Sequence, residues 1–160
     1  MLNYVRKRRW LKEPEAKYFF RRIVEGIQYI HSKNIVHWDI KLDNILLNNQ
    51  GDIKIGDFGV SWLARWDELL KEQCGTPAYI APEILVDDGY FGPPVDMWSA
   101  GVVLFSMLYG TVPFKGQDMT ALHWSIIKGE YELKEDVSQE ARDLVRGLLN
   151  INPKDRLTPE

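Results

Sequence analysis

The stretch from Val95 to Tyr109 constrains the fold of this 160-residue chain more than any other, because it is apolar nearly all round a helix. A helix that is hydrophobic on every face must be buried on every side. A membrane span needs about 20 apolar residues. The longest apolar run here, Ala100 to Tyr109, is shorter and is broken by Gly101 and Ser106. The stretch therefore predicts a central core helix and no contact with a membrane.

The remaining apolar positions predict a mainly α fold with one small antiparallel β hairpin. Apolar residues recur at helical spacing after Pro14, which suits a first helical turn, and Asn34 suits a left-handed cap. Residues 57–83 read as a long irregular segment, and such segments in a compact domain are usually functional or mobile. The expected elements, in one domain, are helices over residues 14–32, 95–109, 121–128 and 139–150 and strands over 35–36, 45–47 and 53–55.

Charge and cysteine content limit the partners and the compartment. The net charge of −3 carries no signature of polyanion binding, so we expect no nucleic-acid partner. A basic cluster at residues 6–9 fits either an anionic partner or one solvated face of a short helix, and we favour the helix. Cys74 is the only cysteine, which excludes an internal disulfide and fits a reducing compartment. No apolar signal peptide follows Met1, and we expect a protein of the cytoplasm, with the nucleus as the alternative.

The expected hairpin makes a geometric prediction about the polar residues at its open end. Asn44 enters its first strand and Asp57 leaves its second, so their side-chain oxygens can face one point. Two hard oxygen ligands with room for water and phosphate suit Mg²⁺. Asp39, in the loop that feeds the strand, can orient a hydroxyl and accept its proton, and Lys41 can neutralise a phosphoryl group. Singly, such residues are more often turn formers than ligands, but their combination favours a metal-phosphate site.

Five short motifs follow one another along the chain: HWDIKLDN at residues 37–44, DFG at 57–59, GTPAY at 75–79, APE at 81–83 and DMWSAG at 96–101. The first resembles the catalytic loop of protein kinases, the second their Mg²⁺-binding motif and the fourth the end of their activation segment. The chain as a whole resembles the C-terminal lobe of a eukaryotic Ser/Thr protein kinase. At Lys41 and Thr76 the sequence resembles Ser/Thr kinases rather than tyrosine kinases. Cys74 with GTPAY is most similar to the calcium/calmodulin-dependent and energy-sensing kinase group.

The resemblance implies a phosphotransferase that uses ATP and Mg²⁺. Asp39 would be the catalytic base, and Lys41 would contact the γ-phosphate. Asn44 and Asp57 would hold Mg²⁺.

The same resemblance implies contacts to nucleotide and protein substrate. Leu46 would lie under the adenine, and the backbone of Asp43 would lie near the ribose. The side chain of Asp43 has two interpretations, a preference for a basic residue near the phosphosite or a solvated loop carboxylate.

Other matched residues would have structural roles. His37 and Phe58 would stack in the column that aligns the two lobes of a kinase. Asp96 would hydrogen-bond the backbone of the catalytic loop. Glu83 and Arg156 would form a buried ion pair, which is costly to break from one side.

Two residues depart from the pattern of the family. Trp38 stands where regulated relatives have an arginine that binds a phosphorylated activation-loop residue, and an indole offers only one N–H donor. Glu72 stands where those relatives have the phosphorylated threonine. We hypothesise that this kinase does not use the usual phosphorylation switch and that Glu72 instead contacts a nearby lysine or arginine. The alternative is that Trp38 marks a decaying or erroneous sequence.

Residues 1–160 contain no glycine-rich loop, strand lysine or partner glutamate of the kinase N-lobe. We therefore expect a partial kinase domain, a C-lobe without the N-lobe or the last C-terminal helix. The isolated chain should be a poor enzyme with exposed apolar surface where those parts pack. The competing function is a non-catalytic pseudokinase or docking lobe that binds through residues 95–150. The retained catalytic and Mg²⁺-binding residues argue against it, and the missing N-lobe argues for it. A Mg²⁺-dependent hydrolase agrees less well with the motif order.

Overall fold

The structure is a computed structural model that describes residues 1–65, 67–86 and 89–160. The expected fold class, mainly α with a small antiparallel hairpin, is confirmed. The helices are α1 (Leu2–Arg8), α2 (Glu13–Ser32), α3 (Pro82–Val86), α4 (Gly92–Tyr109), α5 (Met119–Lys128) and α6 (Gln139–Leu148). The strands are β1 (Ile35–Val36), β2 (Ile45–Leu47), β3 (Ile53–Ile55) and β4 (Trp62–Leu63), and short 3₁₀ turns span Leu42–Asn44 and Pro77–Tyr79.

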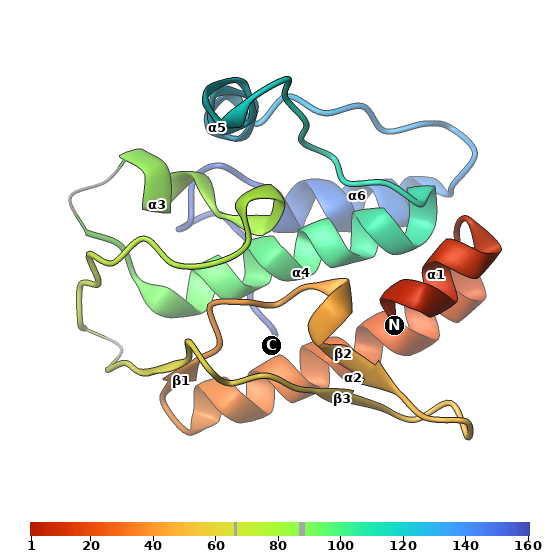
Figure 1. The fold of residues 1–160 in the computed structure, drawn as a ribbon, viewed down its shortest axis with the longest axis horizontal. Coiled ribbons are helices and arrows are strands. Elements are labelled where there is room, and N and C mark those ends of the chain that lie inside the picture. Colours follow the sequence, from red (N-terminus) through yellow and green to blue (C-terminus); the bar gives the residue numbers. More distant parts are fainter. Residues whose placement is uncertain (66, 87–88) are drawn as a thin grey trace.

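Helix α4 lies at the centre of the fold, as its apolar composition predicts. It begins earlier than expected, at Gly92, because two prolines fit its first turn. Figure 1 shows α4 between α2 and α6, and both of these helices pack against it. The helix ends at Gly110, where φ is 71° and an added Cβ would lie 1.9 Å from the carbonyl oxygen of Arg9. Only glycine fits a left-handed turn at so close an approach.

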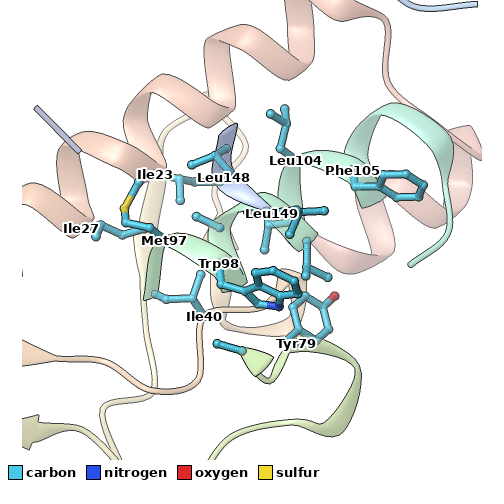
Figure 2. Close-up of a cluster of buried hydrophobic side chains, with 14 of the residues drawn as sticks. Ile23, Ile27, Ile40, Tyr79, Met97, Trp98, Leu104, Phe105, Leu148 and Leu149 are labelled. Atoms are coloured by element: carbon cyan, nitrogen blue, oxygen red, sulfur yellow. The ribbon is translucent and has the colours of Figure 1, made fainter. Parts of the chain in front are cut away.

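Buried side chains of three helical segments form the core around α4. Figure 2 shows side chains of α2, α4 and the end of α6 converging there: Ile23, Ile27, Met97, Trp98, Leu104, Phe105, Leu148 and Leu149. Ile40 and Tyr79 join the same cluster and are fully or almost fully buried. The catalytic-loop motif and the GTPAY motif are therefore anchored on the core and not only on each other.

Two small antiparallel sheets flank the catalytic-loop motif and the DFG motif. Strand β2 pairs with β3 in the register Ile45↔Ile55, which is the expected hairpin. Strand β1 pairs with β4, with Val36 opposite Trp62. The expectation of an irregular segment over residues 57–83 is wrong at β4 and at the start of α3. Strand β4 has only two residues, both exposed, and it forms through pairing with a distant segment rather than through its own pattern.

The helix boundaries otherwise follow the sequence patterns. The basic cluster at residues 6–9 is exposed and lies on and just after α1, as the short-helix interpretation expects. Helix α5 begins at Met119 because the side chain of Asp118 accepts a hydrogen bond from the backbone of Ala121 and caps the first turn. Among the described residues, no helix combines the length and apolar character that a membrane crossing requires.

Candidate active site

The loop from His37 to Asn44 is fixed by a carboxylate from the central helix. Asp96 is fully buried near the start of α4, and it accepts hydrogen bonds from the backbone N–H groups of His37, at 2.9 Å, and Trp38, at 3.0 Å. His31 of α2 approaches the same carboxylate, with its Nε2 2.8 Å from Oδ2. A buried charge needs several such partners to offset its lost hydration. The core therefore sets the path of the loop.

His31 is a residue that sequence analysis missed. It is buried and lies four positions after Ile27 on the apolar face of α2. A polar residue at a core position of a helix is itself a signal, because it needs a buried partner.

The side chain of Asp39 lies at the centre of a polar cluster. Its Oδ1 accepts a 2.8 Å hydrogen bond from the hydroxyl of Thr76, and that hydroxyl accepts one of 2.8 Å from the Lys41 ammonium. The ammonium also lies 3.4 Å from Oδ2 of Asp39. The amide nitrogen of Asn44 donates to the backbone oxygen of Asp39, at 2.8 Å, and to Oδ2, at 3.2 Å. The predicted base, lysine and metal ligand are thus held together in one orientation.

The hairpin brings Asn44 beside the DFG motif. The backbone N–H of Gly56 donates to the carbonyl oxygen of Asn44 at 2.8 Å, so Asp57 follows directly at the open end of the hairpin. Asp57 adopts φ 55°, a left-handed conformation that is uncommon for a residue other than glycine. Strain of this kind gathers at functional sites. Its Oδ1 accepts a 3.2 Å hydrogen bond from the N–H of Gly59.

The donors at this end of the hairpin fit a magnesium ion. Asn44 uses its amide nitrogen to bind Asp39, so its carbonyl oxygen is the atom that would hold a metal, and Asp57 would add a carboxylate. In the described residues no group of three or more His, Cys, Asp or Glu side chains forms a metal cage. Magnesium suits such a sparse donor set, because it usually keeps water and takes phosphate oxygens as further ligands.

His37 connects the catalytic loop to the DFG motif. Its Nδ1 accepts the backbone N–H of Asp39 at 3.1 Å, and its Nε2 lies 2.8 Å from the carbonyl oxygen of Gly56. An accepting Nδ1 and a carbonyl at Nε2 together require the tautomer with its proton on Nε2. The ring packs edge-on to Phe58 with centroids 4.8 Å apart. The two motifs are therefore coupled through one imidazole.

The two residues matched to nucleotide contacts are exposed: Leu46 is 58% exposed, and Asp43 is exposed in the 3₁₀ turn before β2. Leu46 and Asp43 are not part of the hydrogen-bonded cluster around Asp39.

Glu83 and Arg156 form the expected buried ion pair. The guanidinium binds the carboxylate through two hydrogen bonds of 2.6 and 2.9 Å, and both side chains are almost fully buried. Arg156 also donates to the carbonyl oxygens of Asn150, at 3.0 Å, and Pro94, at 2.8 Å. The pair joins α3 to the segment after α6 and to the start of α4.

Trp38 is a core residue and not a solvent-exposed substitute for arginine. Its side chain is 4% exposed, its φ is 67°, and its ring centroid lies 6.3 Å from those of Trp62 and Tyr90. The expected cation contact of Glu72 is not among the ion pairs of the described residues. The Glu72 carboxylate is exposed and accepts a 3.3 Å hydrogen bond from the backbone N–H of Lys71.

Comparison with known proteins agrees with this geometry. The protein kinase domain family matches residues 1–160. The chain is 42% identical over 158 residues to the probable serine/threonine-protein kinase MARK-C of Dictyostelium discoideum, covering 99% of this chain and 20% of that protein. It is 44% identical over 160 residues to the mouse NUAK family SNF1-like kinase 1, covering 100% of this chain and 24% of that protein. It is 42% identical over 151 residues to the CBL-interacting serine/threonine-protein kinase 26 of Arabidopsis thaliana, covering 92% of this chain and 34% of that protein.

These matches define the class: the chain belongs to the serine/threonine protein kinase family. The expected similarity to the energy-sensing group is confirmed, since relatives named as SNF1-like kinases match its whole length. The chain spans between a fifth and about a third of the length of these three relatives.

Proposed function

We propose that this chain is the C-terminal, substrate-binding lobe of a kinase that transfers the γ-phosphate of ATP to protein Ser/Thr hydroxyls. The observation that carries the proposal is the orientation of the Asp39 carboxylate by Thr76, Lys41 and Asn44. A carboxylate held in this way can accept the proton of a substrate hydroxyl as the oxygen attacks phosphorus.

The residues divide the work of phosphoryl transfer among them. Asp39 orients the acceptor hydroxyl and takes its proton, so the new O–P bond forms as ADP departs. Lys41 places a positive charge beside the phosphoryl oxygens. Asn44 and Asp57 hold Mg²⁺, which when bound neutralises phosphate charge. Leu46 supports the adenine, and the backbone of Asp43 lies near the ribose.

Activity requires residues that this sequence does not contain. A glycine-rich loop, a strand lysine and its glutamate partner are absent from residues 1–160, so half of the nucleotide pocket has to be supplied by an N-lobe. We place the protein in the cytoplasm or nucleus, where ATP and protein substrates are available. Asp43 is exposed beside the site and favours substrates with a basic residue near the acceptor.

The experiment is a chimera in which the N-lobe of the mouse NUAK family SNF1-like kinase 1 precedes residues 1–160. Three peptides that differ only in having Ser, Thr or Tyr as the acceptor are incubated with ATP and Mg²⁺. We expect phosphate transfer to Ser and Thr, and none to Tyr or without Mg²⁺. Nucleotide binding without transfer would favour the pseudokinase alternative, and transfer to Tyr would contradict the proposed class.

A further inference from the structure

Three aromatic side chains from separate parts of the chain meet at the catalytic loop. Trp38 precedes Asp39, Trp62 lies in β4 after the DFG motif, and Tyr90 lies just before α4. The centroid of Trp38 is 6.3 Å from each of the other two, and we call the trio the aromatic clamp. Trp38 and Tyr90 are at least 96% buried, whereas Trp62 is 47% exposed and forms the outer side of the clamp.

Backbone hydrogen bonds attach the segment after DFG, at its beginning and in its middle, to residues around this clamp. Trp62 pairs with Val36, and the N–H of Ala64 donates to the carbonyl oxygen of Asn34 at 2.8 Å. Tyr90 and Leu70 exchange two hydrogen bonds of 2.9 Å. The hydroxyl of Tyr90 also donates to the backbone oxygen of Glu72. The segment is thus attached near its beginning and in its middle to residues that surround Trp38.

A further close contact links the same segment to the carboxylate of Asp39. Gly75 has φ 116°, and a Cβ added to it would lie 3.0 Å from the carbonyl oxygen of Trp38. The chain therefore passes closely over Trp38 at Gly75, and the next residue, Thr76, donates its hydroxyl to Asp39. Movement of the segment away from Trp38 removes that hydrogen bond.

The clamp operates through apolar packing and not through charge. Its three side chains carry no charge, and Arg65, on the same segment, pairs with Asp67 at 3.5 Å and not with the catalytic loop. Aromatic pairs retain their contact energy in salt, whereas exposed ion pairs are screened. A segment held in this way needs no added phosphate to become ordered.

We propose that Trp38 is a positioning residue that holds residues 61–65 and 67–76 against the catalytic loop by aromatic packing. Through Gly75 and Thr76 it keeps Asp39 oriented for a protein substrate, so the kinase is active without phosphorylation of that segment. The part of the proposal that concerns activity rests on the proposed kinase function, whereas the structural part does not.

The structural part is tested by hydrogen exchange of the 160-residue chain, read at the amides of Ala64, Leu70 and Tyr90. The variant Trp62→Ala removes the exposed outer ring and leaves the buried core intact. We expect about tenfold faster exchange at these amides, as loss of one aromatic contact implies. The matched control, Trp124→Ala, removes a tryptophan that is 58% exposed on α5 and leaves the exchange unchanged. Unchanged exchange in Trp62→Ala would overturn the proposal, whether or not the protein is an active kinase.

The functional part is tested in the chimera described above. We expect Trp38→Ala to lower kcat about tenfold, because the hydrogen bond from Thr76 to Asp39 is weakened, and to leave KM for ATP within about twofold, whereas Trp38→Phe keeps most of the activity. Phosphatase treatment should leave the parent within about twofold of its starting rate. Loss of most activity after phosphatase treatment would refute the phosphate-independent clamp. So would an equal rise in the KM values for peptide and ATP, because that is the result expected of a merely structural residue.

Discussion

The ion pair between Glu83 and Arg156 offers a quantitative test of how the lobe is held together. Glu83→Ala leaves the guanidinium buried, with its carbonyl contacts to Asn150 and Pro94 but without its counter-charge. Removing one partner of a buried pair typically costs about 3–5 kcal/mol. A domain is stable by about 5–15 kcal/mol in total. We therefore expect a large fall in the free energy of unfolding, measured by urea denaturation.

An uncompensated buried charge and lost packing respond differently when both partners are replaced. Replacing both partners, as Glu83→Leu with Arg156→Met, removes both charges and should recover about half or more of the loss, because apolar pairs of similar volume often substitute for buried ions. The matched surface control is Asp143→Ala, which breaks a 2.7 Å pair with Arg146 whose side chains are 59% and 50% exposed. The control substitution should lower the free energy of unfolding by less than about 1 kcal/mol. A similarly small cost for Glu83→Ala would refute the reasoning.

Two further predictions concern a hydroxyl and a pH dependence. Thr76→Val in the chimera removes the hydroxyl between Lys41 and Asp39, and we expect kcat to fall about 10- to 100-fold, with Thr76→Ser restoring it to within about threefold. Unchanged kcat in Thr76→Val would show that this bond does not orient Asp39. Hydrogen bonds from the side chain of Ser138 and, to a smaller extent, from its backbone hold the pKa of Glu13 in the folded protein below its ordinary value of 4.5. Glu13 therefore stabilises the fold fully above pH 4.5. This contribution is lost as the pH falls through the lower pKa of the folded state. In pH-dependent urea denaturation the difference between the parent and Glu13→Gln should therefore shrink towards low pH, and a difference that grows on acidification would contradict the sign.

The sequence predicts most of the framework because its long elements have strong local patterns. Helix α4 is apolar nearly all round, α2 repeats its apolar residues at helical spacing, and the hairpin has a turn between two apolar runs. Their patterns do not depend on distant residues, so their existence can be inferred before the structure is known. Their ends depend on caps such as Asp118, which is why the boundaries move by small amounts.

The remaining features depend on pairings between distant segments. Strand β4 exists because Trp62 lies opposite Val36, and the α3 region is held by Arg156 from the far end of the chain. His31 becomes part of the site only because α4 brings Asp96 beside it. In the sequence alone, Trp38 and Glu72 show only which two residues of the family's phosphate switch are missing. The structure adds what Trp38 contacts instead, Trp62 and Tyr90, and shows that Glu72 has an exposed carboxylate bonded to backbone.

The most direct test of the central claim is the steady-state rate of the chimera with Asp39 changed to Asn. Asparagine preserves the size of the side chain but cannot accept the hydroxyl proton, and positioned bases contribute about 10²–10⁴-fold to rate. We predict a fall in kcat of that order with both KM values almost unchanged, while the exposed control Asp143→Asn on α6 keeps the parent rate. An Asp39→Asn variant that turns over at the rate of the parent would show that this carboxylate is not the base and that the site has been assigned wrongly.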